Sequence, residues 1–144
     1  MIKLIIFDLD GVLIDACEWH RVSLNKALKE VCNYEISLKD HKSTFNGLPT
    51  RTKLQKLTDI GIISINDHRK IYDKKQKLAI ETIEECADIS DDKISLMKYL
   101  KGNGYILACF TNSIRKTAML MLRKTGILNY LDAVVTNQDV DKPK

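Results

Sequence analysis

The chain has 144 residues and a mass of 16.5 kDa, which fits one folding unit of ordinary domain length. Hydrophobic residues make up 44% of the sequence, which argues against intrinsic disorder, and no apolar run approaches the length needed to span a bilayer. That lack of a long apolar run predicts no membrane partner. The net charge of +4 comes from 23 basic and 19 acidic residues scattered along the chain, so we expect no nucleic-acid partner.

The first predicted element is a short apolar strand over Lys3 to Phe7, of the kind found when both faces of a parallel sheet are covered. From Glu18 to Asp88 the apolar residues mostly recur at helical intervals, and nothing in this stretch indicates a strong strand. A second apolar strand follows at Tyr105 to Phe110. The next helix stops at Gly126, and a third strand is predicted at Ala133 to Val135.

Alternating strands and helices are typical of a parallel sheet with right-handed crossovers. We therefore predict an α/β fold with a doubly wound, parallel-sheet (Rossmann-like) core formed by residues 1–17 and 89–144. The long helical stretch of residues 18–88 exceeds a simple connection, and we interpret it as an inserted α-helical cap.

Polar side chains follow two of the predicted strands. Asp8 and Asp10 end the first strand, with Gly11 permitting a sharp turn, and Thr111 and Asn112 end the second strand. Since the carboxyl ends of parallel strands meet at one sheet edge, we expect these four residues to converge. Two carboxylates suit Mg²⁺, which would let a phosphate approach them, and one carboxylate could then attack phosphorus.

The stretch from Leu4 to Asp15, Leu-Ile-Ile-Phe-Asp-Leu-Asp-Gly-Val-Leu-Ile-Asp, closely resembles the first motif of the haloacid dehalogenase-like hydrolases. The resemblance is to the phosphatase branch with a helical cap after the first strand. It implies that Asp8 is the nucleophile that forms an aspartyl-phosphate, and that Asp10 is the general acid and base. It also implies that the Asp8 carboxylate and the Asp10 carbonyl bind Mg²⁺.

The end of the second predicted strand resembles the second motif of that family, which assigns Thr111 to phosphoryl binding with Asn112 as support. The third motif is a lysine, for which Lys144 is our prediction and Lys142 the alternative. Either ammonium could stabilise the charge on the transferred phosphoryl group.

The fourth motif of the family is an acidic pair beyond the third, and the sequence ends at Lys144 before it. We therefore expect a C-terminally incomplete core with weak metal binding. The first strand would keep an unpaired apolar edge, from which we expect marginal stability or self-association.

The stretch Asn46 to Lys53 lies where related enzymes carry a substrate-selecting cap loop, so Arg51 or Lys53 would contact the distal part of a small phosphorylated substrate. A plainer reading of the same stretch is a Pro-Gly helix entry capped by Thr50.

The predicted reaction is the hydrolysis of a small phosphorylated metabolite by a Mg²⁺-dependent phosphatase. A phosphomutase would use the same Asp8 and Asp10, and an inactive remnant or interaction fragment is a further alternative. A phospho-receiver domain fits less well, because its acceptor normally ends an internal strand. The four cysteines are widely spaced, which favours buried thiols over disulfides or zinc ligands. The opening apolar run from Met1 to Phe7 meets Asp8 too early for a secretory signal, so a cytoplasmic location is expected.

Overall fold

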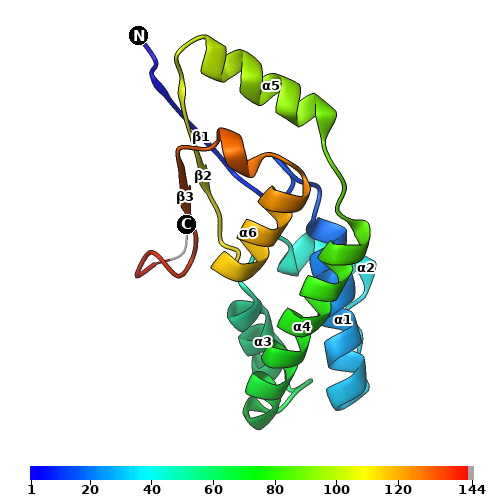
Figure 1. Cartoon of the computed structure of the whole chain (residues 1–144). Helices are drawn as coiled ribbons and strands as arrows, with labels where there is room; N and C mark the ends of the chain where they lie inside the picture. Colours follow the sequence, from blue (N-terminus) through cyan, green and yellow to red (C-terminus); the bar gives the residue numbers. More distant parts are fainter. Residues whose placement is uncertain (143–144) are drawn as a thin grey trace. The chain divides into compact units, whose positions relative to one another are not determined.

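The computed structural model describes residues 1–142 and shows two compact units, drawn in Figure 1. The first unit combines Met1–Ala16 with the residues from Ile83 onward, and it contains every strand of the described chain. The second unit is Cys17–Thr82, and all its regular secondary structure is helical. The predicted α/β class is confirmed, since apolar strands alternate with helices and no strand lies between residues 18 and 101 of the described chain.

The sheet of the first unit has three parallel strands in the order β1 (Leu4–Phe7), β2 (Ile106–Phe110) and β3 (Ala133–Val135). Phe7 pairs with Cys109 in the register, and Cys109 pairs with Val134. All three strands therefore end at the same edge of the sheet, which brings the loops that follow them together.

This unit also contains helices α5 (Asp91–Gly102) and α6 (Arg115–Lys124), the short turn η3 (Leu128–Tyr130) and the last turn of α4 (His68–Cys86) from Ile83, with α5 lying against β2. Successive side chains of β2 point to opposite faces of the sheet, and two of them are completely buried. The largest apolar side chains without exposure in this unit come from the sheet, the helices and the loop after β1: Leu9, Ile83, Met97, Leu107, Met121 and Leu122.

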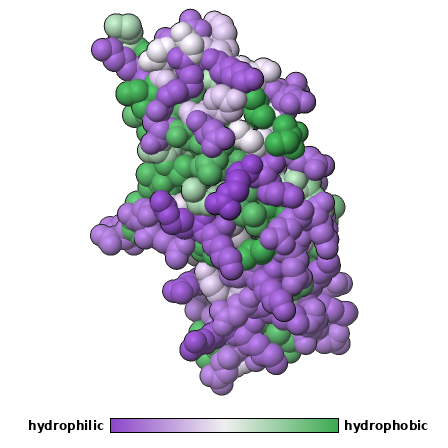
Figure 2. Space-filling view, viewed as in Figure 1, coloured by the Kyte–Doolittle hydropathy of each residue, from purple (hydrophilic) through white to green (hydrophobic). Residues whose placement is uncertain are grey.

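One face of the sheet is exposed, which corrects the expectation that the first strand would be covered on both faces. Leu4 and Ile6 of β1 are 48% and 59% exposed, and Ile106, which pairs with Leu4, is 51% exposed. Among the described residues, β1 has a neighbouring strand on one side only. Figure 2 shows hydrophobic atoms gathered on the surface over the strands.

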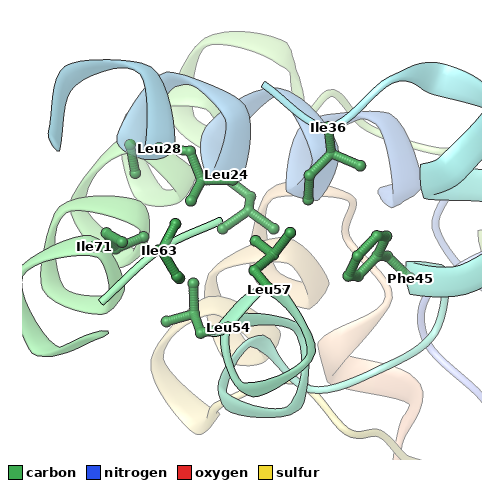
Figure 3. Packing of buried hydrophobic residues seen from close by; sticks show 9 residues of the cluster. Leu24, Leu28, Ile36, Phe45, Leu54, Leu57, Ile63 and Ile71 are labelled. Carbon is green, nitrogen blue, oxygen red and sulfur yellow. The ribbon is translucent and has the colours of Figure 1, made fainter. Parts of the chain in front are cut away.

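The second unit packs helices around its own apolar core, shown in Figure 3. Its elements are α1 (Cys17–Cys32), α2 (Leu38–Asp40), the π-helical turn η1 (His41–Phe45), α3 (Thr50–Asp59), η2 (Ile65–Asp67) and α4 (His68–Cys86), the last as far as Thr82. Leucines 24, 28, 54 and 57 interdigitate with isoleucines and Phe45. The expected cap at Thr50 is wrong: Thr50 is the first helical residue, Pro49 precedes it, and no side chain caps the helix. Proline fixes the backbone there without a side-chain acceptor.

Candidate active site

Asp8 follows the last residue of β1 and is half-buried. Its Oδ1 atom accepts a hydrogen bond of 2.7 Å from the backbone N–H of Leu9. This bond holds the carboxylate beside the turn that follows the strand. A carboxylate fixed at the end of a parallel strand lies where ligands bind in open α/β sheets.

Asp10 lies in a turn fixed by backbone hydrogen bonds. The carbonyl of Leu9 accepts from the N–H groups of Leu13 and Ile14, each at 3.0 Å, and the N–H of Gly11 donates to the carbonyl of Ile14 at 2.7 Å. Gly11 has φ of 81°, a left-handed conformation in which a side chain would be strained. The turn thereby returns the chain so that Asp10 stays at the sheet edge.

Thr111 and Ser113 bring the end of β2 to Asp10. The hydroxyl of Ser113 donates to Asp10 Oδ2 at 2.9 Å, and the hydroxyl of fully buried Thr111 donates to the same oxygen at 3.4 Å. The N–H of Ser113 donates to Thr111 Oγ1 at 3.0 Å. The predicted convergence of Asp10 with the second strand end is therefore present, and Asn112 lies half-buried in the same turn.

Hydrogen bonds connect the loop after β3 to the start of α6. Oδ2 of Asp139 accepts from both the N–H and the hydroxyl of Thr136, at 2.8 and 2.7 Å, and from Arg115 Nη1 at 3.0 Å. Hydrogen bonds from the hydroxyl and N–H of Thr136, together with Arg115, lower the pKa of Asp139. The N–H of Arg115 donates to Gln138 Oε1 at 2.8 Å, so the start of α6 is held against this loop.

The two lysines predicted for the third motif follow this loop. Lys142 is exposed, and Lys144 lies outside the described residues. The choice between them therefore stays a prediction.

The donors at this edge fit Mg²⁺ in kind. Asp8 and Asp10 supply carboxylate and carbonyl oxygens, which this hard cation prefers, and Mg²⁺ commonly keeps several waters when few protein oxygens bind it. No cluster of three or more acidic, histidine or cysteine side chains suited to a metal occurs among residues 1–142. The described chain thus offers two carboxylates and no fuller cage.

Arg51 and Lys53, the predicted substrate contacts, both belong to α3 in the helical unit. The guanidinium of exposed Arg51 lies 5.4 Å from the ring centroid of Tyr72, a cation–π distance. Lys53 is only 6% exposed. A lysine with so little exposure is unusual, because lysine side chains mostly lie at the surface.

Burial also affects a histidine in this helical unit. His41 is 4% exposed, and its Nδ1 atom has no hydrogen-bond partner among residues 1–142. Burial, assisted by the charges of Lys53 and Arg21, lowers the pKa of His41 to about 4. The neutral imidazole is therefore the form that the folded unit favours near neutral pH.

Two residues with notable environments in the structure were not predicted from the sequence. Ser113, whose hydroxyl lies two positions after Thr111 in the sequence, was not among the predicted site residues. Lys75 is 6% exposed, and it lies four residues from buried Ile71 and four from buried Ala79. A lysine at helical spacing between apolar residues indicates a side chain on the buried face of the helix, and the sequence shows this pattern.

Comparison with known proteins assigns the class. The model of the haloacid dehalogenase-like hydrolase family matches residues 5–144, nearly the whole chain. The chain therefore belongs to this family of hydrolases, and the resemblance found in its motifs is confirmed.

Particular relatives are phosphatases by name. Pyrophosphatase PpaX of Bacillus velezensis is 29% identical, with 97% of this chain and 62% of the relative aligned. The phosphoglycolate phosphatase of Nitrosospira multiformis is 26% identical over 99% of this chain and 64% of its own length. The chain thus spans somewhat less than two thirds of these curated relatives.

Solved structures agree on the fold. A protein of Haemophilus somnus described as a predicted phosphoglycolate phosphatase is 24% identical with a TM-score of 0.84, covering 99% of this chain and 66% of that one. A β-phosphoglucomutase of Clostridium difficile is also 24% identical, with a TM-score of 0.82 and coverage of 100% and 66%. At this identity the likeness concerns the fold.

Proposed function

We propose that this chain carries the phosphoryl-transfer site of a phosphatase that hydrolyses a small phosphorylated metabolite through an aspartyl-phosphate on Asp8. The observation that supports this most directly is the link between the ends of two adjacent strands: Asp10, which follows β1, accepts hydrogen bonds at Oδ2 from Thr111 and Ser113, which follow β2. An acid and a hydroxyl anchor beside a second carboxylate are the groups that such a transfer needs. The membership of a hydrolase family agrees with it.

The reaction would proceed in two steps. In the first, an Asp8 oxygen forms a bond to phosphorus while the bond from phosphorus to the ester oxygen breaks, and Asp10 gives a proton to the departing alkoxide. In the second, Asp10 takes a proton from water as the water oxygen attacks phosphorus. The bond between phosphorus and Asp8 then breaks, which releases inorganic phosphate and restores both side chains.

Other residues would bind the phosphoryl oxygens. The Thr111 hydroxyl can turn from Asp10 to a phosphoryl oxygen, with Asn112 in the same turn as support and the ammonium of Lys144, or alternatively Lys142, as a counter-charge. Mg²⁺ bound by the Asp8 carboxylate and the Asp10 carbonyl would offset the repulsion between the phosphate and the two acids.

The helical unit would act as a cap, covering residues 18–88 in the sequence-based division, and would supply substrate contacts. Lys53, whose side chain is almost entirely buried, and exposed Arg51 are the candidates for contact with an anionic group of the substrate. Small phosphorylated compounds are named among the relatives, phosphoglycolate in one and xylulose bisphosphate in a crystallised complex of another. We propose the same chemical class for this chain.

A phosphomutase is the second candidate, because the family fold is shared with a β-phosphoglucomutase and the same two carboxylates would serve. The products separate the two reactions. A phosphatase releases inorganic phosphate, whereas a mutase returns the phosphoryl group to a second position of the substrate.

We also propose that the exposed sheet face formed by Leu4, Ile6 and Ile106 mediates self-association. Parallel sheets are ordinarily covered on both faces, and an edge strand without a neighbour favours pairing. No helix among residues 1–142 is long and apolar enough to cross a membrane. A cytoplasmic location is part of the proposal, supported by four cysteines of which none forms a disulfide.

The proposed activity is tested by phosphate release from a panel of small phosphate esters with and without Mg²⁺. We expect turnover that depends on Mg²⁺ and is lost in Asp8→Asn, since an amide is a far poorer nucleophile. Asp15→Asn is the matched control, because it removes an exposed carboxylate a few residues away. Turnover retained in Asp8→Asn, or lost equally in Asp15→Asn, would contradict the assignment.

A further inference from the structure

We propose that Ser113 is a positioning residue for Asp10: its hydroxyl holds the carboxylate in place while Thr111 turns to bind the phosphoryl group. The inference rests on the proposed function for its consequence, but its geometry stands on the hydrogen bonds of the described chain. Ser113 Oγ donates to Asp10 Oδ2 at 2.9 Å, the shorter of the two contacts made to that oxygen by the β2 turn.

The hydroxyls of Thr111 and Ser113 have different roles because Thr111 has only one proton to donate. A threonine hydroxyl carries one proton, and the oxygen of Thr111 already accepts from the N–H of Ser113. Its single proton can therefore go to Asp10 or to a phosphoryl oxygen, one at a time. The present contact with Asp10 is 3.4 Å, which is long for a hydrogen bond between oxygens and is readily exchanged.

Ser113 is placed so that its hydroxyl can keep its hydrogen bond to Asp10 when the Thr111 hydroxyl turns away from Asp10. Its N–H is bonded to Thr111 Oγ1, and its carbonyl accepts from the N–H of Asn137 at 3.4 Å. The backbone of Ser113 is thus attached to the end of β2 and to the loop after β3. A short hydrogen bond from an anchored residue restricts the side-chain rotation of Asp10, whose backbone is fixed by its own turn.

Correct placement of Asp10 matters most for the proton transfer assigned to it. A general acid must lie within hydrogen-bond reach of the departing oxygen, and the need for it grows as the leaving group becomes more basic. Loss of the Ser113 hydroxyl should therefore slow the reaction of an alkyl phosphate more than that of p-nitrophenyl phosphate. A general loss of folding or of phosphate binding would slow both esters alike.

The first test is crystallographic and does not depend on turnover. Structures of the chain with Ser113→Ala and with Ser113→Thr are compared with the unmodified chain. We expect the Asp10 carboxylate to adopt another rotamer in Ser113→Ala and to keep its place in Ser113→Thr, which retains the hydroxyl. An unchanged Asp10 rotamer in Ser113→Ala would overturn the proposal.

The second test measures kcat/KM for p-nitrophenyl phosphate and for glycerol phosphate, with Ser95→Ala, at an exposed position of α5, as the matched control. For Ser113→Ala we expect the value for glycerol phosphate to fall on the order of tenfold further than that for p-nitrophenyl phosphate. Ser113→Thr should restore the ratio. Equal losses on both esters would overturn the proposal. Absence of turnover in the unmodified chain would refute the proposed function instead, and the crystallographic comparison would still decide the role of Ser113.

Discussion

At the scale of single residues, Thr111 links the end of β2 to the acid of the first motif. Its hydroxyl is fully buried, accepts from the N–H of Ser113 and donates to Asp10. Thr111→Val keeps the shape of the side chain and removes the hydroxyl. We predict that kcat/KM for a phosphate ester falls about 100-fold, because one preorganised donor to the phosphoryl group is lost.

Thr125→Val is the control for Thr111→Val. Thr125 is also buried, and its hydroxyl donates to the Met121 carbonyl at 2.8 Å, away from the carboxylates. Both variants should lose about 1 kcal/mol of unfolding free energy in urea titrations. Only the first should lose activity, and a similar loss in both would remove Thr111 from the site.

His41 gives the helical unit a pH-dependent stability. Because the folded-state pKa of His41 is lowered to about 4, the unfolded chain binds a proton more readily between that value and about 6.5. Stability from this group is thus full above about pH 6.5 and declines as the pH falls toward 4. By about pH 4.5 we expect a loss on the order of 2 kcal/mol beyond that of His41→Met. Urea unfolding curves at neutral pH and at pH 4.5 measure this difference, and equal losses in both proteins would refute it.

The residues of the site were readable to different degrees. The placement of Asp10 and Thr111 at one edge of the sheet could be predicted, because apolar runs indicate where strands end and parallel strands end at the same edge. The roles of Asp8, Asp10 and Thr111 stay predictions. The contact of Ser113 with Asp10 could not be predicted, since it depends on how the turn after β2 folds back onto Asp10. The burial of Lys53 and Lys75 depends on packing between helices, which the spacing of residues indicates only in part.

At the scale of elements, Gly126 ends the α6 region in a conformation that a side chain resists. Its φ is +78°, and a Cβ there would lie 2.8 Å from the Cδ1 atom of Ile94. Gly126→Ala should therefore destabilise the chain by about 1–2 kcal/mol or more.

Gly102→Ala is the matched comparison for Gly126→Ala. Gly102 ends α5 with an ordinary φ, and a Cβ there would meet nothing within 4 Å. Its unfolding free energy should stay within about 0.5 kcal/mol of the unmodified value or rise. Differential scanning calorimetry of both variants checks the pair, and equal midpoints would contradict the strain assigned to Gly126.

Local patterns predicted the elements well where a single period dominates. The strands at Leu4–Phe7 and Ile106–Phe110 and the stop at Gly126 are confirmed. The prediction that both faces of the sheet are covered was wrong. An apolar strand indicates that its side chains favour burial, but it does not indicate that helices cover both faces. The cap at Thr50 was wrong because Pro49 already directs the chain into α3.

At the scale of the whole molecule, the exposed sheet face should govern association. Ile6→Glu places a charge on the face formed by Leu4, Ile6 and Ile106, and Ile65→Glu places one at a similarly exposed position of the helical unit. We predict concentration-dependent association of the unmodified chain in sedimentation velocity. Association should weaken about tenfold or more with Ile6→Glu, since burying an unpaired charge is costly, and little with Ile65→Glu. A monomer at all accessible concentrations would contradict this role of the face.

The class of the whole molecule followed from the order of its elements and from the first motif, and the family match confirms it. Its activity could be predicted only as a reaction type. The substrate depends on side chains such as Lys53 and Arg51, whose chemistry selects an anion without selecting one compound.

The measurement that tests the central claim most directly is the chemical identity of the phosphorylated group. The chain is mixed with a radiolabelled phosphate ester and Mg²⁺, quenched in acid within milliseconds, and digested for mass spectrometry. We predict an acyl-phosphate, released by hydroxylamine, on the peptide that contains Asp8, and no label in Asp8→Asn. Label on another residue, or phosphate release by Asp8→Asn at the rate of the unmodified chain, would contradict the claim.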